Sequence, residues 1–176
     1  SNIVDATNYT MLEIGEPLHA FDYSVLVRRA AGKPVVISTR TAQPGEKLTT
    51  LDGAERALTQ ANVLVCDTAG ALSLAGVMGG AESEISAATT DILLEAAAWN
   101  FINIRRTATQ HALPSEASYR FSRGVHPALA VEGLERCLYW MALWSGGKVA
   151  PGIVDNYPLP PADPLVEITP RDIRRA

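Results

Sequence analysis

The sequence predicts an α+β fold in which β-sandwich-like layers of mostly antiparallel strands carry helices packed on them. Three observations support this prediction. Between residues 35 and 75, apolar residues recur with a period of two in short runs. The dipeptide Asp52-Gly53, between two of these runs, is a strong hairpin signal. Before and after this stretch, apolar residues recur at helical spacing, between residues that cap or end helices.

Helices are expected on both sides of the strand region. The first, at 5–14, is ended by Gly15, and the longest begins at Pro127 and ends before Gly146-Gly147. The pattern of the longest helix predicts a buried stripe of Leu134, Leu138 and Met141. The remaining helices are a short turn from Asp22 through Leu26, one at 101–111 capped by Asn100, and a short one capped by Ser115 with Ser118.

Short strands are expected at 35–39, 47–51, 56–58, 63–66, 71–75 and 91–94. The last two flank a glycine cluster, Gly76 and Gly79-Gly80, which allows positive φ or close approach to the main chain. The strand at 91–94 ends at a carboxylate, Glu95, among leucines and alanines. This arrangement predicts a small-molecule pocket. The alternative is a β-hairpin in which Glu95 forms a salt bridge with a nearby arginine.

The composition is that of an ordinary globular protein, with 176 residues, 47% of them hydrophobic and 19% charged. A net charge of −4 argues against a general nucleic-acid binder, so RNA contacts must come from local patches. No apolar run approaches the length of a membrane span. Cys66 and Cys137 lie among apolar residues without metal-ligand spacing, which predicts reduced, buried thiols and a cytoplasmic location.

The chain is expected to be an excised piece of a larger protein, since it begins at Ser1 without a methionine. Residues 1–156 are predicted to form one domain. Residues 157–164 (YPLPPADP) have the composition of a stiff proline-rich linker. Residues 165–176 are predicted to begin a following domain, with a strand at 166–168 and a helix start at Thr169-Pro170.

Several polar residues are open to either a structural or a functional interpretation. Thr7 and Asn8 either cap the first helix or aim a hydroxyl and an amide into a cleft. His19, between Leu18 and Ala20, is either a core or turn residue or a catalytic group. The arginine candidates for RNA contact either lie on a solvated face or bind phosphate; they are Arg105, Arg106, Arg120 and Arg123.

The sequence contains none of the short motifs of nucleophilic, nucleotide-binding or zinc-dependent enzymes. His111 and His126 show no ligand-like pairing, so no metal site is expected. An enzyme built from these residues would hold no covalent nucleophile or cofactor. It would act by positioning a substrate and a water molecule.

Six motifs, in order, resemble the β subunit of bacterial phenylalanyl-tRNA synthetase: VDATNYTMLEIGEPLHAFD, LTTLDG, LAGVMGG, ILLEAA, IRRTA and SEASYRFSRGV. They are similar to its B3/B4 region, which carries the editing site, and cover roughly residues 3–156. The tail EITPRDIRRA looks like the start of the family's B5 domain. The resemblance implies a three-layer B3/B4 fold that hydrolyses tyrosine wrongly attached to tRNA(Phe). It also implies an α2β2 assembly with an α subunit, and a parent enzyme that uses ATP and Mg in other domains, with no cofactor here.

The resemblance also assigns roles to individual residues. Glu95 matches the family's reader of the tyrosine hydroxyl, and Thr7 and Asn8 match residues that line the pocket. His19 matches a position near the scissile ester, so His19 and Asn8 are the catalytic candidates. The remaining substrate-binding candidates are Pro17, Ala75, Gly76, Ser115 and Ala117. Many relatives have threonine where this chain has Ser115, a change that keeps the hydroxyl.

Two alternatives remain beside the editing hypothesis. The first is a non-catalytic scaffold that docks tRNA or the α subunit. The second is a free-standing deacylase acting in trans, which the B5-like tail and the abrupt start of the chain disfavour. In the editing hypothesis a positioned water attacks the ester carbonyl near Asn8, His19 and the backbone of Ala75 and Gly76. The general base is either His19, a tRNA hydroxyl or the substrate's amino group.

Overall fold

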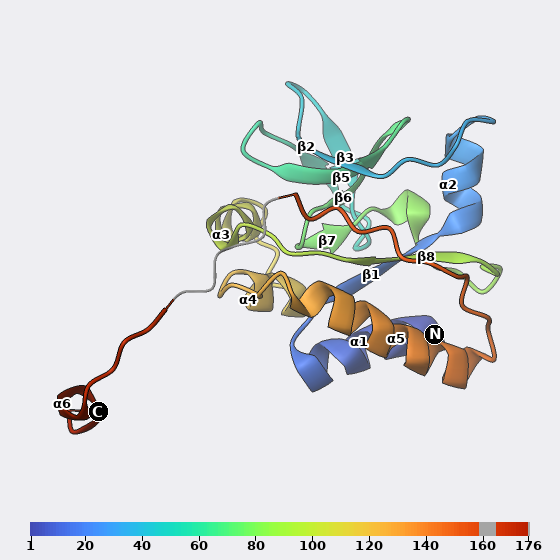
Figure 1. Cartoon of the computed structure of the whole chain (residues 1–176). Coiled ribbons are helices and arrows are strands. Elements are labelled where there is room, and N and C mark those ends of the chain that lie inside the picture. Colours follow the sequence, from blue (N-terminus) through green and yellow to red (C-terminus); the bar gives the residue numbers. More distant parts are fainter. Residues whose placement is uncertain (159–164, 176) are drawn as a thin grey trace.

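The computed structural model describes residues 1–158 and 165–175, and it confirms the α+β class. The elements lie in three tiers in Figure 1: a group of strands, the long β1–β8 pair, and two helices, α1 and α5, beneath that pair. The strands are β1 (Leu18–Asp22), β2 (Ser38–Thr41), β3 (Lys47–Thr49), β4 (Glu55–Ala57), β5 (Val63–Asp67), β6 (Gly70–Leu74), β7 (Met78–Gly79) and β8 (Ile92–Ala96).

The strands form three antiparallel sheets: β1-β8, β2-β5-β6-β7 and β3-β4. The predicted turn at Asp52-Gly53 does join β3 to β4. The alternative interpretation, a β-hairpin between the strands on either side of the glycine cluster, is wrong, because β6 pairs with β5 and β7 whereas β8 pairs with β1. Pairing with β1 lets Leu18, Ala20, Ile92 and Leu94 share one core cluster with residues of α1 and α5.

The helices begin and end close to the residues that the sequence pointed to. Side chains of Asp22, Asn100 and Ser115 cap α2, α3 and α4 as predicted. The first helix begins earlier than expected, because Ser1 caps it. The helices are α1 (Asn2–Ile14), α2 (Tyr23–Arg29), η1 (Ala81–Ser83, a 3₁₀ turn), α3 (Phe101–Gln110), α4 (Glu116–Phe121), α5 (Leu129–Ser145) and α6 (Pro170–Ile173).

The buried stripe of α5 differs from the prediction. Gly133, Cys137 and Met141 are the buried residues of this helix, while Leu134 and Leu138 are half-buried at its margin. These three positions repeat every four residues, and Cys137 and Met141 pack with Ala6 and Ala20. Cys66 and Cys137 are free thiols in the core, as predicted.

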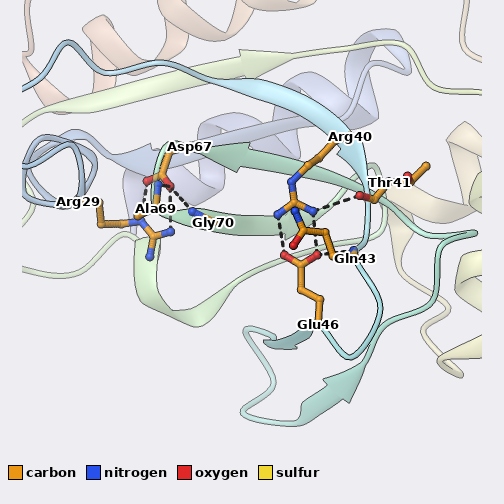
Figure 2. Close-up of polar contacts among 8 residues, drawn as sticks. All are labelled: Arg29, Arg40, Thr41, Gln43, Glu46, Asp67, Ala69 and Gly70. Carbon is orange, nitrogen blue, oxygen red and sulfur yellow. Dashed lines mark hydrogen bonds and ion pairs between the residues drawn. The ribbon is translucent and has the colours of Figure 1, made fainter.

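Two ion pairs, Arg29–Asp67 and Arg40–Glu46, stabilise the four-stranded sheet and its connections (Figure 2). Asp67, at the end of β5, accepts hydrogen bonds from Arg29 Nε and Nη2 at 2.6 and 3.0 Å, and from the backbone of Ala69 and Gly70. Arg40 of β2 donates to both carboxylate oxygens of Glu46 at 2.8 and 2.7 Å. The Arg29–Asp67 contact therefore ties α2 to the β5–β6 turn.

The C-terminal predictions have mixed outcomes. Most of the proposed proline-rich linker at 157–164 lies outside the described residues. Residues 166–168 form no strand, and no strand lies beside them among the described residues to pair with. Thr169 caps the helix α6, as its sequence indicated.

Candidate active site

A cavity of about 280 Å³ opens between α1, the β1–β8 pair, the turn before β7 and the start of α4. Most of the substrate-site residues inferred from the sequence line it, although they come from five separate stretches of the chain. Those lining it are Thr7, Asn8, Pro17, His19, Gly76, Glu95, Ser115 and Ala117. Ala75 does not line it; this residue is buried, and its backbone N–H donates to the Val63 carbonyl at 3.0 Å.

His19 and Glu95 lie directly opposite each other across the β1–β8 pair. Residues opposite each other on antiparallel strands point to the same face of the sheet, which is here the face lining the cavity. The His19 ring packs edge-on against Phe21, with ring centroids 4.5 Å apart. Its Nε2 atom is buried without a hydrogen-bond partner. Burial lowers the pKa of His19 to about 4, so the imidazole is neutral at pH 7.

Glu95 presents an unusual carboxyl group to this cavity. Its Oε2 atom is buried without a hydrogen-bond partner, and no ion pair reaches it from the described residues. Burial therefore raises the pKa of Glu95 to about 7. The alternative in which an arginine pairs with Glu95 is thus wrong. An unsatisfied buried carboxyl in a cavity is suited to a ligand that carries its own hydrogen-bonding group.

The helix α1 contributes Thr7 and Asn8. The Thr7 hydroxyl donates to the Val4 carbonyl at 2.9 Å, so its hydrogen is already used within the helix. Asn8 is exposed, and its amide makes no hydrogen bond to the part of the chain that the structure describes. Because Ser1 caps the helix, capping is not the role of either residue. Asn8 is therefore the α1 side chain with a free amide at the cavity.

Glycines bring the main chain close to the catalytic candidates. At Gly79, an added Cβ would lie 2.6 Å from His19 Cε1 and 3.0 Å from Nε2. Gly76 has a φ of +65°, and an added Cβ there would lie 2.6 Å from Trp99 Cδ1. The glycine cluster seen in the sequence therefore forms the wall of the cavity against which His19 and Trp99 pack.

The Ser115 hydroxyl is engaged in two internal hydrogen bonds. It donates to the Val77 carbonyl at 2.8 Å and accepts from the Ser118 backbone N–H at 3.0 Å. These bonds tie the start of α4 to the Gly76–Val77 turn. The geometry favours a supporting role for Ser115, whereas the neighbouring Ala117 presents only a small side chain to the cavity.

Replacing Ser115 with alanine should lower the free energy of unfolding by about 1–2 kcal/mol, because a helix cap and a contact to the Val77 carbonyl are lost together. Ser115→Thr should stay close to wild type, since it keeps the hydroxyl. Urea unfolding monitored by circular dichroism measures both. Ser122→Ala, which removes an exposed hydroxyl at the other end of α4, is the control. Equal losses for Ser115→Ala and Ser122→Ala would contradict the supporting role.

Comparison with known proteins identifies this architecture. The family model of the B3/4 domain matches residues 1–146. The chain belongs to the B3/4 domain family. It is 49% identical over 168 residues to the phenylalanine–tRNA ligase β subunit of Anaeromyxobacter dehalogenans, and 49% identical over 166 residues to that of Nocardia farcinica. These alignments cover 96% and 94% of this chain but 20% and 19% of the relatives, so the chain spans about a fifth of their length.

The four arginines proposed for RNA contact lie on and after α3 and α4 of the B3/4 chain. They differ in whether their side chains already contact other groups of the protein. Arg120 pairs with Glu116 at 2.6 Å, and Arg105 donates to the Ser122 carbonyl at 2.9 Å. Arg123 lies over the Tyr119 ring, 3.4 Å from its centroid. Arg106 is exposed and makes no hydrogen bond or ion pair with the described residues. Arg106 is therefore the most available of the four for a phosphate.

The B3/4 cavity also contains residues that sequence reasoning did not single out: Met11, Leu51, Val77, Met78, Trp99 and Phe121. Leu51 lies at the tip of the β3–β4 hairpin, and its N–H donates to the Gly79 carbonyl at 3.0 Å. The position of Leu51 beside the predicted Asp52-Gly53 turn could have marked it as a candidate cavity residue. Trp99 had none, since an isolated tryptophan after a strand is usually a core residue.

The described residues, 1–158 and 165–175, contain no group of three or more His, Cys, Asp or Glu side chains placed to hold a metal ion. None of their helices is both long and apolar enough to cross a membrane.

Proposed function

We propose that the chain is an editing hydrolase that cleaves the ester joining tyrosine to tRNA(Phe). The observation that carries the proposal is the buried carboxyl of Glu95, which lies unpartnered in a cavity opposite a neutral histidine. The relatives give the context, because they are phenylalanine–tRNA ligase β subunits. A ligase for phenylalanine has a specific need to remove tyrosine.

That need follows from the limits of hydrophobic recognition. A pocket shaped for phenylalanine rejects a near-isostere with one added hydroxyl only about 10²-fold. A second site can instead select for the hydroxyl. Glu95 would exchange hydrogen bonds with the phenol of tyrosine, whereas phenylalanine would leave the buried carboxyl unsatisfied. Discrimination by a missing hydrogen-bond partner reaches about 10⁴-fold or more.

The reaction requires a water molecule to attack the ester carbonyl, so that the bond to the ribose oxygen breaks and tyrosine leaves the tRNA. Asn8 and the backbone around Gly76 would orient the ester and stabilise the developing oxyanion. Because His19 is neutral at pH 7, it can accept a hydrogen bond from the attacking water or take its proton. A tRNA hydroxyl or the substrate's amino group remains an alternative base.

The partners proposed for the chain follow from the same assignment. The aminoacylated 3′ end of tRNA(Phe) would enter the cavity, with its backbone near the α3 and α4 arginines, of which Arg106 is the most available. The complete enzyme would pair an α with a β subunit in an α2β2 assembly in the cytoplasm. ATP and Mg would act in its other domains.

The proposal is tested by following deacylation of tyrosyl- and phenylalanyl-tRNA(Phe) by the complete enzyme, with Glu95 intact or replaced. We expect wild type to clear the tyrosyl ester at least 100-fold faster than the phenylalanyl ester. Glu95→Ala should reduce that preference at least tenfold, while Glu82→Ala, at an exposed glutamate outside the cavity, leaves it unchanged. If wild type treats both esters alike, the editing proposal fails and a docking scaffold becomes the better account.

A further inference from the structure

The tip of the β3–β4 hairpin forms one wall of the cavity, where Leu51 lines it. Two backbone links join this tip to the main chain at the end of β7. The Leu51 N–H donates to the Gly79 carbonyl at 3.0 Å, and Thr50 forms an isolated bridge with Gly80. The hairpin is otherwise a separate sheet of two strands. Because a two-stranded hairpin alone is only marginally stable, the position of its tip depends on further contacts.

The Leu51 side chain packs beside His19. A Cβ added to Gly79 would lie 3.0 Å from Leu51 Cδ1, and it would lie 2.6 Å from Cε1 and 3.0 Å from Nε2 of His19. These three atoms therefore surround one point over Gly79. The Nε2 atom is the one that is buried without a hydrogen-bond partner. Leu51 is consequently part of the apolar cover beside this nitrogen, although 39% of the leucine itself is exposed.

Arg56 of β4 binds the residues on either side of Leu51. Its Nε donates to the Thr50 hydroxyl at 2.9 Å, and its Nη2 donates to Asp52 Oδ2 at 2.5 Å. The Thr50 hydroxyl in turn donates to Asp52 Oδ1 at 2.6 Å. The third contact of Arg56 leaves the hairpin: Nη1 donates to the carbonyl of His111, the C-cap residue of α3, at 2.9 Å. The guanidinium therefore ties the chain on both sides of Leu51 to the end of a helix.

Burial distinguishes the Arg56 contacts from an ordinary surface ion pair. Only 14% of the Arg56 side chain is exposed, and Thr50 is fully buried. In the same hairpin Lys47 pairs with Glu55 at 2.6 Å, but these side chains are 60% and 61% exposed. An exposed pair of this kind contributes little, because solvent and salt screen it. A largely buried arginine that donates to three acceptors instead fixes their relative positions, because its guanidinium is a rigid fork.

We propose that Arg56 is a positioning residue: its hydrogen bonds hold Leu51 beside His19 at the cavity. Arg56 does not line the cavity, so it acts through Leu51. The position of Leu51 matters for ester hydrolysis because a displacement of about 1 Å near a reacting centre can cost about 10²-fold in rate. This consequence for catalysis rests on the editing function proposed above, whereas the position of Leu51 does not.

Nuclear magnetic resonance of the chain tests the position without relying on catalysis. In wild type the Leu51 amide should have an order parameter of about 0.85, and its methyl groups should show an Overhauser contact with the His19 ring. Arg56→Met keeps a long side chain but donates no hydrogen bond. It should lower the order parameter below about 0.6 and weaken the contact at least threefold. The control Lys47→Met breaks the exposed pair of the same hairpin and should change neither value.

Wild-type values of both measurements in Arg56→Met would overturn the proposal, because Arg56 would then support only the stability of the fold. Arg56→Lys is a second variant in case the loss of the charge prevents folding. Lysine keeps the charge but lacks the planar fork that donates to three acceptors at once. The Leu51 order parameter should therefore fall in this variant too, and an unchanged value would count equally against the proposal.

Steady-state hydrolysis of tyrosyl-tRNA(Phe) by the complete enzyme tests whether Arg56 acts through Leu51. Arg56→Met and Leu51→Ala should each lower kcat/KM at least tenfold, whereas Leu51→Met, which keeps an apolar side chain of similar size, should stay within threefold. The double variant should lose no more than about the larger single loss. Losses that multiply to about 100-fold or more would overturn the assignment. If wild type itself does not hydrolyse the ester, the editing proposal fails, while the resonance data still decide the role of Arg56.

Discussion

We expect the difference in free energy of unfolding between Glu16→Gln and wild type to shift in favour of the variant by about 2–3 kcal/mol as the pH is raised from 5 to 8. Glu16 lies fully buried in the connection between α1 and β1, and both of its carboxylate oxygens lack a hydrogen-bond partner among the described residues. Glutamine has nearly the shape of the neutral acid but cannot ionise. The variant therefore keeps the packing against Gly133 and avoids the buried negative charge that wild type acquires at high pH.

The sign follows from proton binding. The unfolded chain releases the Glu16 proton near the ordinary pKa of 4.5, whereas the folded chain holds it until about 7. Between these values the folded state binds more protons, so wild-type stability falls as the pH rises. The loss is complete above the folded pKa, and a glutamine variant does not undergo it.

Two groups in the cavity titrate in the same range. Glu95, whose pKa is also raised to about 7, adds a loss of the same sign. His19 acts oppositely: its pKa is lowered to about 4, so wild type gains stability as the pH rises from about 4 to the ordinary value of 6.5 and no more above it. The contributions of Glu95 and His19 cancel when Glu16→Gln is compared with wild type at each pH, because both chains contain these two residues.

Urea unfolding of wild type, Glu16→Gln and the surface control Glu132→Gln at pH 5, 6, 7 and 8 measures the difference directly. The control should track wild type within about 0.5 kcal/mol, since the Glu132 side chain is exposed. A difference between Glu16→Gln and wild type that stays constant across the four values would show that Glu16 titrates normally, and would contradict its burial as a neutral acid.

The features that could be predicted from the sequence are those set by neighbouring residues. Asp22, Asn100 and Ser115 cap helices by binding backbone groups two or three positions ahead, so the signal lies within one turn. The same holds for Asp52-Gly53, whose hairpin joins two adjacent strands. The class of the fold followed from these local signals and from the change of hydrophobic period.

The pairing of β1 with β8 could not be predicted in this way. Its partners, such as His19 and Glu95, lie more than seventy residues apart, and nothing in either strand selects the other over the nearer β6. The glycine cluster and Glu95 indicated a pocket from the residues alone, but the other site residues were assigned through resemblance to a family, because Thr7, His19 and Ser115 are unremarkable until the fold brings them to one cavity. The hydrogen bond from the Ser115 hydroxyl to the Val77 carbonyl likewise joins residues 38 positions apart in the sequence.

Gly76→Ala should lower the free energy of unfolding by about 2–5 kcal/mol. Two costs add at this position. The φ of +65° disfavours any residue with a Cβ by about 1–2 kcal/mol. The new Cβ would also lie 2.6 Å from Trp99 Cδ1, 2.8 Å from Ile104 Cδ1 and 3.1 Å from Phe121, and such overpacking costs about 1–3 kcal/mol.

Gly53→Ala separates these two costs. Gly53 lies in the β3–β4 turn with a φ of +78°, and an added Cβ would have no heavy atom within 4 Å. It should therefore lose only the conformational part, about 1–2 kcal/mol. Urea unfolding of both variants at one pH gives the packing cost as their difference. Equal losses of unfolding free energy in the two variants would mean that Trp99 and Ile104 can move aside at little cost. The wall of the cavity would then be more easily deformed than its close contacts indicate.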